Sequence, residues 1–177
     1  HQQLISEAKK RKTDDQALIL MSHAHMQGGE TSDSERPIII GNEEALSTAL
    51  FDEVIDYVAL GHLHKPQKVQ HAHIRYSGSP LPMSFSELNY PHQVVMVEIH
   101  HGQLQTITPL LVPRSVPLQR IPPQPQAIEH VLTLLAAQDW PSSTPDYLQP
   151  YLQVRVLLDK PEPSLRSKIE QVLENKG

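Results

Sequence analysis

The chain has 177 residues, of which 38% are hydrophobic, and carries a formal net charge of −5 at pH 7. This length is enough for one well-packed core, or for one domain with part of another. The absence of cysteine excludes disulfides, thiolate metal clusters and cysteine nucleophiles, and the negative charge argues against a surface that holds nucleic acid by charge alone. No apolar run approaches the roughly 18 residues of a membrane helix and no signal peptide is evident, so we expect a cytoplasmic protein with no membrane contact.

The first part of the chain alternates between predicted helices and strands. An amphipathic helix is expected over residues 2–12, and its basic C-terminal cluster would cap the helix dipole. Two aliphatic runs, 17–22 and 54–60, read as buried strands. Between them we expect a polar loop (27–37), a short strand (38–40) and a short helix (42–51).

Hairpins and a proline-rich boundary follow. Residues 68–70 and 73–77 are expected to form one hairpin, and residues 93–100 and 103–112 a longer one that turns at His101 and Gly102. Prolines cluster over 109–125 and 141–163, and clustered prolines stiffen connections, so a domain boundary is placed near 113–119. Beyond it, a helix (127–138), a strand (152–158) and a helix (164–174) predict a small α/β unit, incomplete as written.

Each predicted buried strand ends near a histidine pair with one residue between. His23 and His25 follow the first strand, and His62 and His64 follow the second. Side chains at a strand end emerge at the rim of a sheet, where metals and ligands commonly bind. On strand alternation, His62 and His64 would share one face while Leu63 points into the core, and Gly61 would allow a bend or a close approach.

Nitrogen and oxygen ligation remains when cysteine is absent, and it suits manganese, magnesium, iron or catalytic zinc. The alternative is that these histidines are polar strand ends bonded to loops. His71 and His73 form a third pair, but no buried run leads into it, so we do not expect ligands there. The other histidines that lack partners in the sequence are read as surface or turn residues: His92, His100, His101 and His130.

The string from Asp56 to His64 contains Gly61-His62-Leu63-His64, which resembles the Gly-His-x-His motif of calcineurin-like metallophosphoesterases. Together with Ser22-His23 and the segment from Tyr76 to Pro80, it resembles the C-terminal part of the SbcD family of bacterial nuclease subunits. The resemblance implies the second half of a four-layer αββα sandwich over 1–113, followed by a small α/β DNA-capping domain over 114–177.

The resemblance also implies roles for individual residues. His23 and His62 would bind one metal ion and His64 a second, the ions being Mn²⁺, with Mg²⁺ as the alternative. His25 would either face the substrate phosphate or support its loop. Ser77 and Ser79 would either contact DNA phosphates or form a plain turn beside Gly78.

Several motifs of the family would lie upstream of this chain: Asp-x-His, Gly-Asp-x-x-Asp and Gly-Asn-His-Asp. They supply the bridging carboxylate and the histidine that assists the leaving group, so we assign no catalytic residue here and expect the fragment alone to be inactive. Two adjacent divalent ions orient and activate water for attack on a phosphodiester and neutralise the phosphate charge, which is why both halves are needed.

The function implied by the resemblance is that of a manganese-dependent subunit of an ATP-dependent complex that takes part in DNA repair, recombination and replication. It would act as an exonuclease on double-strand DNA ends and as an endonuclease on single strands and hairpins. The partners would be an SbcC-type ATPase subunit and a second copy of the nuclease subunit. Two alternatives stay open: a phosphoesterase for nucleotides or phosphoproteins, and a non-catalytic scaffold fragment.

Overall fold

A computed structural model describes residues 2–36, 45–51, 53–140 and 143–174. The chain divides into two compact units, His1–Pro113 and Arg114–Gly177, which are described separately below. The mixed α/β class predicted from the sequence is confirmed, whereas the four-layer sandwich stays a prediction. None of the helices in the described ranges is long and apolar enough to cross a membrane.

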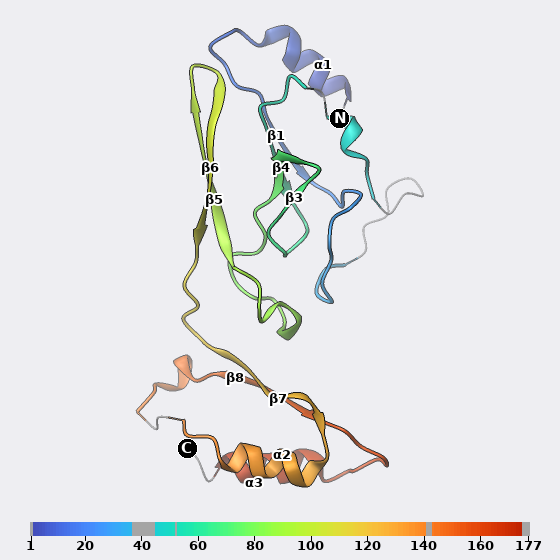
Figure 1. The fold of residues 1–177 in the computed structure, drawn as a ribbon, viewed down its shortest axis with the longest axis vertical. Coiled ribbons are helices and arrows are strands. Elements are labelled where there is room, and N and C mark those ends of the chain that lie inside the picture. Colours follow the sequence, from blue (N-terminus) through green and yellow to red (C-terminus); the bar gives the residue numbers. More distant parts are fainter. Residues whose placement is uncertain (1, 37–44, 52, 141–142, 175–177) are drawn as a thin grey trace. The chain divides into compact units, whose positions relative to one another are not determined.

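A mixed four-stranded sheet forms the centre of the first unit (Figure 1). Its strands run in the order β1-β2-β4-β3, with β1, β2 and β4 parallel and β3 antiparallel to β4. The predicted first helix and hairpin are confirmed. The bounds are α1 (Gln2–Arg11), β1 (Ile19–His23), β2 (Tyr57–Gly61), β3 (Gln67–Val69) and β4 (His71–Tyr76).

The core of this unit lies around β2 and β4, where Val58, Ile74 and Tyr76 are almost completely buried. The prediction of a buried strand is therefore confirmed for β2, which pairs on both sides. It is wrong for β1, because Ile19 and Met21 are 49% and 82% exposed. One face of β1 is therefore exposed, while Leu20 and Leu18, the latter just before the strand, pack against the core from the other face.

A long antiparallel hairpin, β5 (Gln93–His100) and β6 (Gln103–Leu111), follows the sheet in the chain. It turns at His101 and Gly102 as predicted, both with positive φ. A Cβ on Gly102 would lie 2.5 Å from the Asp14 carbonyl oxygen, so the turn needs glycine for close approach as well as for its backbone angle.

Single-turn 3-10 helices occur where the chain changes direction: η1 (Thr48–Leu50) and η2 (Phe85–Glu87). The helix predicted over 42–51 is therefore only a single 3-10 turn in its described part. Ser47 caps that turn by accepting a hydrogen bond from the Ala49 N–H. The strand predicted over 38–40 lies outside the described residues.

The second unit packs two helices with a parallel strand pair. Its elements are β7 (Leu118–Gln126), α2 (Ile128–Ala136), η3 (Asp146–Leu148), β8 (Tyr151–Val156) and α3 (Leu165–Glu174). α2 buries Val131 and Leu135 completely and contacts β7, β8 and α3. The predicted helices and strand are confirmed at shifted bounds.

Strand β7 was missed, because prolines 122, 123 and 125 belong to the cluster that led us to place only a domain boundary near 113–119 and no strand after it. The ladder to β8 shifts register between Ile121 and Gln126, so these prolines lie where no pairing is required. Proline, which has no N–H, is tolerated at such irregularities in a strand.

Asp56, just before β2, joins three segments of the first unit. Its carboxylate accepts hydrogen bonds of 2.8 Å from both Lys12 Nζ and the Leu18 N–H. Partial burial would raise the pKa of Asp56, but these two donors outweigh it and lower the pKa below the ordinary value.

We expect Asp56→Asn to lower the free energy of unfolding by about 1–2 kcal/mol at pH 7, because the charged acceptor is lost at a partly exposed site. A lowered pKa in the folded state gives stability that is present above the unfolded pKa and is lost as pH falls through the folded value. The difference between variant and wild type in urea unfolding should therefore disappear in strong acid. Asp159→Asn, at an exposed position, is the matched control; an equal difference at every pH would contradict the charge argument.

Candidate functional site

Three histidines gather where β1 and β2 end. The two strands are parallel and pair His23 with Gly61, so their carboxyl ends lie side by side. The His23 and His62 rings meet edge to face with centroids 5.4 Å apart, and the His25 ring lies 6.2 Å from His62. The structure thus brings together two predicted ligands and one predicted substrate contact.

Gly61 makes this approach possible. A Cβ on Gly61 would lie 3.0 Å from Nδ1 of His23, which bears out the expectation of a close approach at this glycine. Strand β2 ends at Gly61 and His62 has a φ of 106°. Strand alternation therefore does not relate His62 to His64, and that argument was wrong, although Leu63 is buried as predicted, at 2% exposed.

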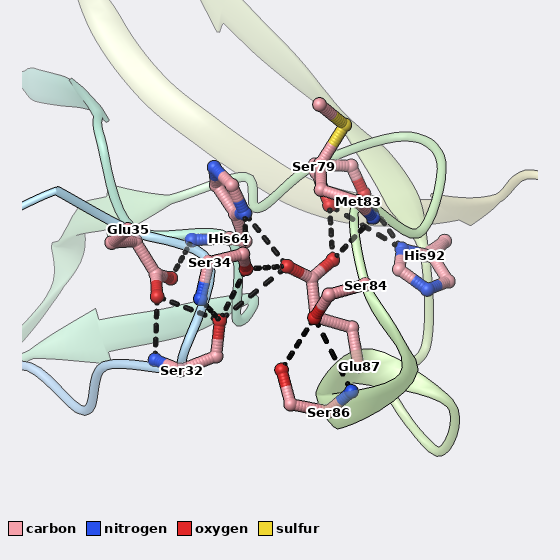
Figure 2. A network of polar contacts seen from close by, with 10 residues as sticks. All are labelled: Ser32, Ser34, Glu35, His64, Ser79, Met83, Ser84, Ser86, Glu87 and His92. Atoms are coloured by element: carbon pink, nitrogen blue, oxygen red, sulfur yellow. Dashed lines mark hydrogen bonds and ion pairs between the residues drawn. The ribbon is translucent and has the colours of Figure 1, made fainter. Parts of the chain in front are cut away.

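His64 has different neighbours from those of the other predicted ligands (Figure 2). Its Nδ1 lies 2.7 Å from Oε1 of Glu87 and 3.1 Å from Oγ of Ser34. Its backbone N–H donates to Oε1 of Glu35 at 2.8 Å. Glu87 is completely buried, and neither carboxylate was singled out from the sequence.

Donors surround both carboxylates and lower their pKa values. Burial would raise the pKa of Glu87, but hydrogen bonds from the Met83 N–H, Ser34 and His64 outweigh it. Glu35 follows the same pattern. Burial would raise its pKa, but hydrogen bonds from Ser32 and the His64 N–H outweigh burial and lower it. Both groups are therefore anionic near neutral pH.

The pKa of His62 is shifted below its ordinary value. Burial is the largest cause, followed by the nearby charges of His23 and His25, with Glu35 opposing and His64 adding to the shift. A lowered pKa keeps this imidazole neutral, which is the form that binds metal ions.

Ser77 and Ser79 occupy the loop after β4. The Ser79 N–H donates to the His64 carbonyl at 3.0 Å, and its hydroxyl lies 3.4 Å from Oε2 of Glu87. Ser77 Oγ makes only a long contact of 3.5 Å with the Gln93 carbonyl. Ser79 thus already has partners within the protein, and its contact with DNA phosphate stays a prediction.

His92 was read as a surface or turn residue, and this was wrong. It is 6% exposed, and its Nδ1 lies 3.1 Å from the Ser79 carbonyl oxygen. The remaining isolated histidines, His100, His101 and His130, are exposed as predicted. His71 and His73 stack on each other on β4, with ring centroids 5.7 Å apart.

The fit of these residues to a metal ion is partial. Within the described ranges, no three His, Asp or Glu side chains already stand close enough together to hold a metal ion. The imidazoles of His23 and His62 nevertheless supply the right donor chemistry. The Glu87 contact leaves Nε2 of His64 available, so all three predicted ligands fit a divalent cation in their chemistry.

Tyr76 ties the histidine-bearing loop to the core. Its hydroxyl donates to the Ala24 carbonyl at 2.6 Å and accepts from the Met26 N–H at 2.9 Å. Both bonds flank His25. Burial raises the pKa of Tyr76 to about 12, while the Met26 bond opposes the rise, so the ring stays protonated and can keep donating.

Tyr76→Phe should lower the free energy of unfolding by about 1–3 kcal/mol, because two buried backbone groups lose their partner. Urea unfolding measures the change. Tyr147→Phe, at a ring that is 77% exposed, should be neutral. If both variants unfold like the wild type, the hydroxyl does not hold this loop.

Comparisons with known proteins bear on both units. Residues 114–177 match the SbcD_C family model, described as the Type 5 capsule protein repressor C-terminal domain. The SbcD subunit of the nuclease SbcCD from Rhodobacter capsulatus is 37% identical over 162 residues, which cover 89% of this chain. The chain is similar to the C-terminal part of SbcD.

The similarity covers most of this chain but only part of the relative, because the chain spans 38% of the relative's length. The residues matched by the family model coincide with the second compact unit. The resemblance to SbcD inferred from the residues around His62 is therefore confirmed. The metal roles of His23, His62 and His64 stay predictions.

Proposed function

We propose that this chain is the C-terminal part of the nuclease subunit of an SbcCD-type complex. The observation that carries the proposal is the 37% identity to a nuclease subunit over 89% of the chain. The gathering of His23, His25 and His62 at the ends of two parallel strands supports it, because ligands in such sheets bind at the carboxyl edge.

In this proposal His23 and His62 hold one divalent ion and His64 holds a second, with Mn²⁺ preferred and Mg²⁺ as the alternative. The ions would supply charge neutralisation and water activation for phosphodiester hydrolysis. The residues of this chain would bind and orient: Gly61 lets His23 approach His62, and Glu87 and Glu35 hold His64 from its side chain and its backbone.

The substrates in this proposal are double-strand DNA ends, cut as an exonuclease, and single strands and hairpins, cut as an endonuclease. The partners are an SbcC-type ATPase subunit and a second copy of the nuclease subunit, working in DNA repair, recombination and replication in the cytoplasm. The second unit would serve as the DNA cap. A net charge of −5 means that local basic patches or bound cations must offset repulsion from DNA phosphates.

The test compares the 177-residue chain with the full-length protein, each with and without the ATPase subunit, on blunt duplexes and hairpins with Mn²⁺. We expect cleavage by the full-length protein, and weak Mn²⁺ binding without cleavage by the chain alone, because no three His, Asp or Glu side chains of the described residues stand close enough together to hold an ion. Full-length protein that hydrolyses only nucleotides or phosphoproteins would favour another phosphoesterase. Protein that binds no Mn²⁺ and cuts nothing would favour a scaffold.

A further inference from the structure

A buried carboxylate behind His64 has no role in the proposed function beyond holding that side chain. Glu87 comes from η2, 23 residues further along the chain, and its side chain is completely buried. Burying a charge is costly unless hydrogen bonds compensate for it. An isolated buried glutamate that served only packing would be better replaced by an apolar residue.

Both oxygens of Glu87 accept hydrogen bonds (Figure 2). Oε2 accepts from the Met83 N–H at 2.9 Å and faces Ser79 Oγ at 3.4 Å. Oε1 accepts from Ser34 Oγ and lies 2.7 Å from His64 Nδ1. Each of these four neighbours can therefore donate to the carboxylate.

This arrangement decides which ring nitrogen of His64 carries the proton. An ionised carboxylate only accepts hydrogen bonds, so the 2.7 Å contact requires the proton to lie on Nδ1. The Ser34 hydroxyl donates its proton to Glu87, so it also faces Nδ1 as an acceptor. In the neutral ring, Nε2 is then the nitrogen that carries the lone pair.

We propose that Glu87 is a positioning residue that accepts the Nδ1 proton of His64 and so presents Nε2 of that ring to a divalent cation. A carboxylate behind a metal-binding histidine fixes the ring's tautomer and orientation and makes it a stronger ligand. The inference rests on the proposed function in that it takes His64 as a ligand.

Glu87→Gln in the full-length protein tests the inference. Both carboxylate oxygens of Glu87 accept hydrogen bonds, whereas the glutamine amide has only one oxygen. In one orientation its NH₂ group faces the Met83 N–H, and in the other it faces His64 Nδ1, so glutamine cannot reproduce both contacts. We expect the affinity for Mn²⁺, measured by calorimetry, to fall by about 10–100-fold. Glu98→Gln, on the exposed face of β5, is the matched control and should bind as the wild type does.

A second measurement needs neither metal nor activity. Nitrogen-15 NMR of histidine-labelled, metal-free, full-length protein distinguishes the protonated from the bare ring nitrogen, and a His64→Gln variant assigns the signal. We expect His64 to carry its proton on Nδ1 in the wild type, and an altered proton distribution in Glu87→Gln. Because the wild-type spectrum is decisive by itself, the test survives if the variant does not fold.

The outcomes separate this inference from the proposed function. A bare Nδ1 on His64 in the wild type, with the proton on Nε2, or unchanged Mn²⁺ affinity in folded Glu87→Gln, would overturn the role of Glu87. If His62→Ala and His64→Ala also bind Mn²⁺ as the wild type does, the proposed metal site itself fails.

Discussion

Replacing His23, His62 or His64 by alanine in the full-length protein should abolish Mn²⁺-dependent DNA cleavage. Each substitution removes an imidazole from a two-ion site whose charge neutralisation and water activation carry the proposed chemistry. The stability cost should differ among the three. His23 is exposed and His62 half-buried at strand ends, so these variants should stay within about 1 kcal/mol of the wild type in metal-free buffer.

His64→Ala should be less stable by about 1–3 kcal/mol even without metal, because it removes a donor from the buried Glu87. Melting each variant with and without Mn²⁺, beside a nuclease assay, measures both effects. The ligand variants should also lose the rise in melting temperature that Mn²⁺ gives the wild type.

His71→Ala and His73→Ala are the matched controls. The two rings contact each other on β4, and replacing either should do little to activity or stability. Variants at His23 and His62 that are destabilised without metal yet remain active would reverse the assignment. His23 and His62 would then be hydrogen-bonding groups of the fold and not metal ligands.

The sequence predicted those features that depend on short-range patterns. The aliphatic run of β2, the turn at His101 and Gly102, and the amphipathic stripe of α2 each show their periodicity or turn residues directly. The exposure of Ile19 and Met21 on β1 could not be predicted, because it depends on which elements cover the strand. Strand β7 was hidden by its prolines, which are tolerated where the ladder to β8 is interrupted.

Part of the candidate site was also predictable. Histidines after two strands predicted a metal site at strand ends, and the family resemblance joined His23 with His62. The structure brings these two together because β1 and β2 are parallel neighbours that end at one edge. Glu87 was not predictable, because the stretch of chain between it and His64 carries no periodic signal that would bring them together. Ser84 and Glu87 have the spacing of a helix start, which indicates a local turn and not a contact with a distant histidine.

Deleting residues 114–177 from the full-length protein should impair cutting of DNA ends far more than hydrolysis of a small phosphodiester. The predicted metal ligands all lie before Pro113, and the second unit has its own core at Val131 and Leu135. Removal should therefore leave the metal site in place and take away the surface proposed to position the duplex. A small phosphodiester does not need such positioning.

The cations of the second unit, of which Arg166 and Lys168 are exposed and Arg155 is partly buried, provide an internal control. Arg166 pairs with Glu170 at 2.7 Å and Lys168 with Glu162 at 3.0 Å, while Arg155 donates to the Pro123 carbonyl at 2.6 Å. These partners lie within the same unit, so neutralising Arg166 or Lys168 alone should change DNA cutting by only a few-fold.

The deletion is tested by steady-state rates on a DNA duplex and on the small phosphodiester, with bound Mn²⁺ measured in parallel. Equal losses on the duplex and the small phosphodiester would show that the second unit stabilises the nuclease domain and does not position DNA.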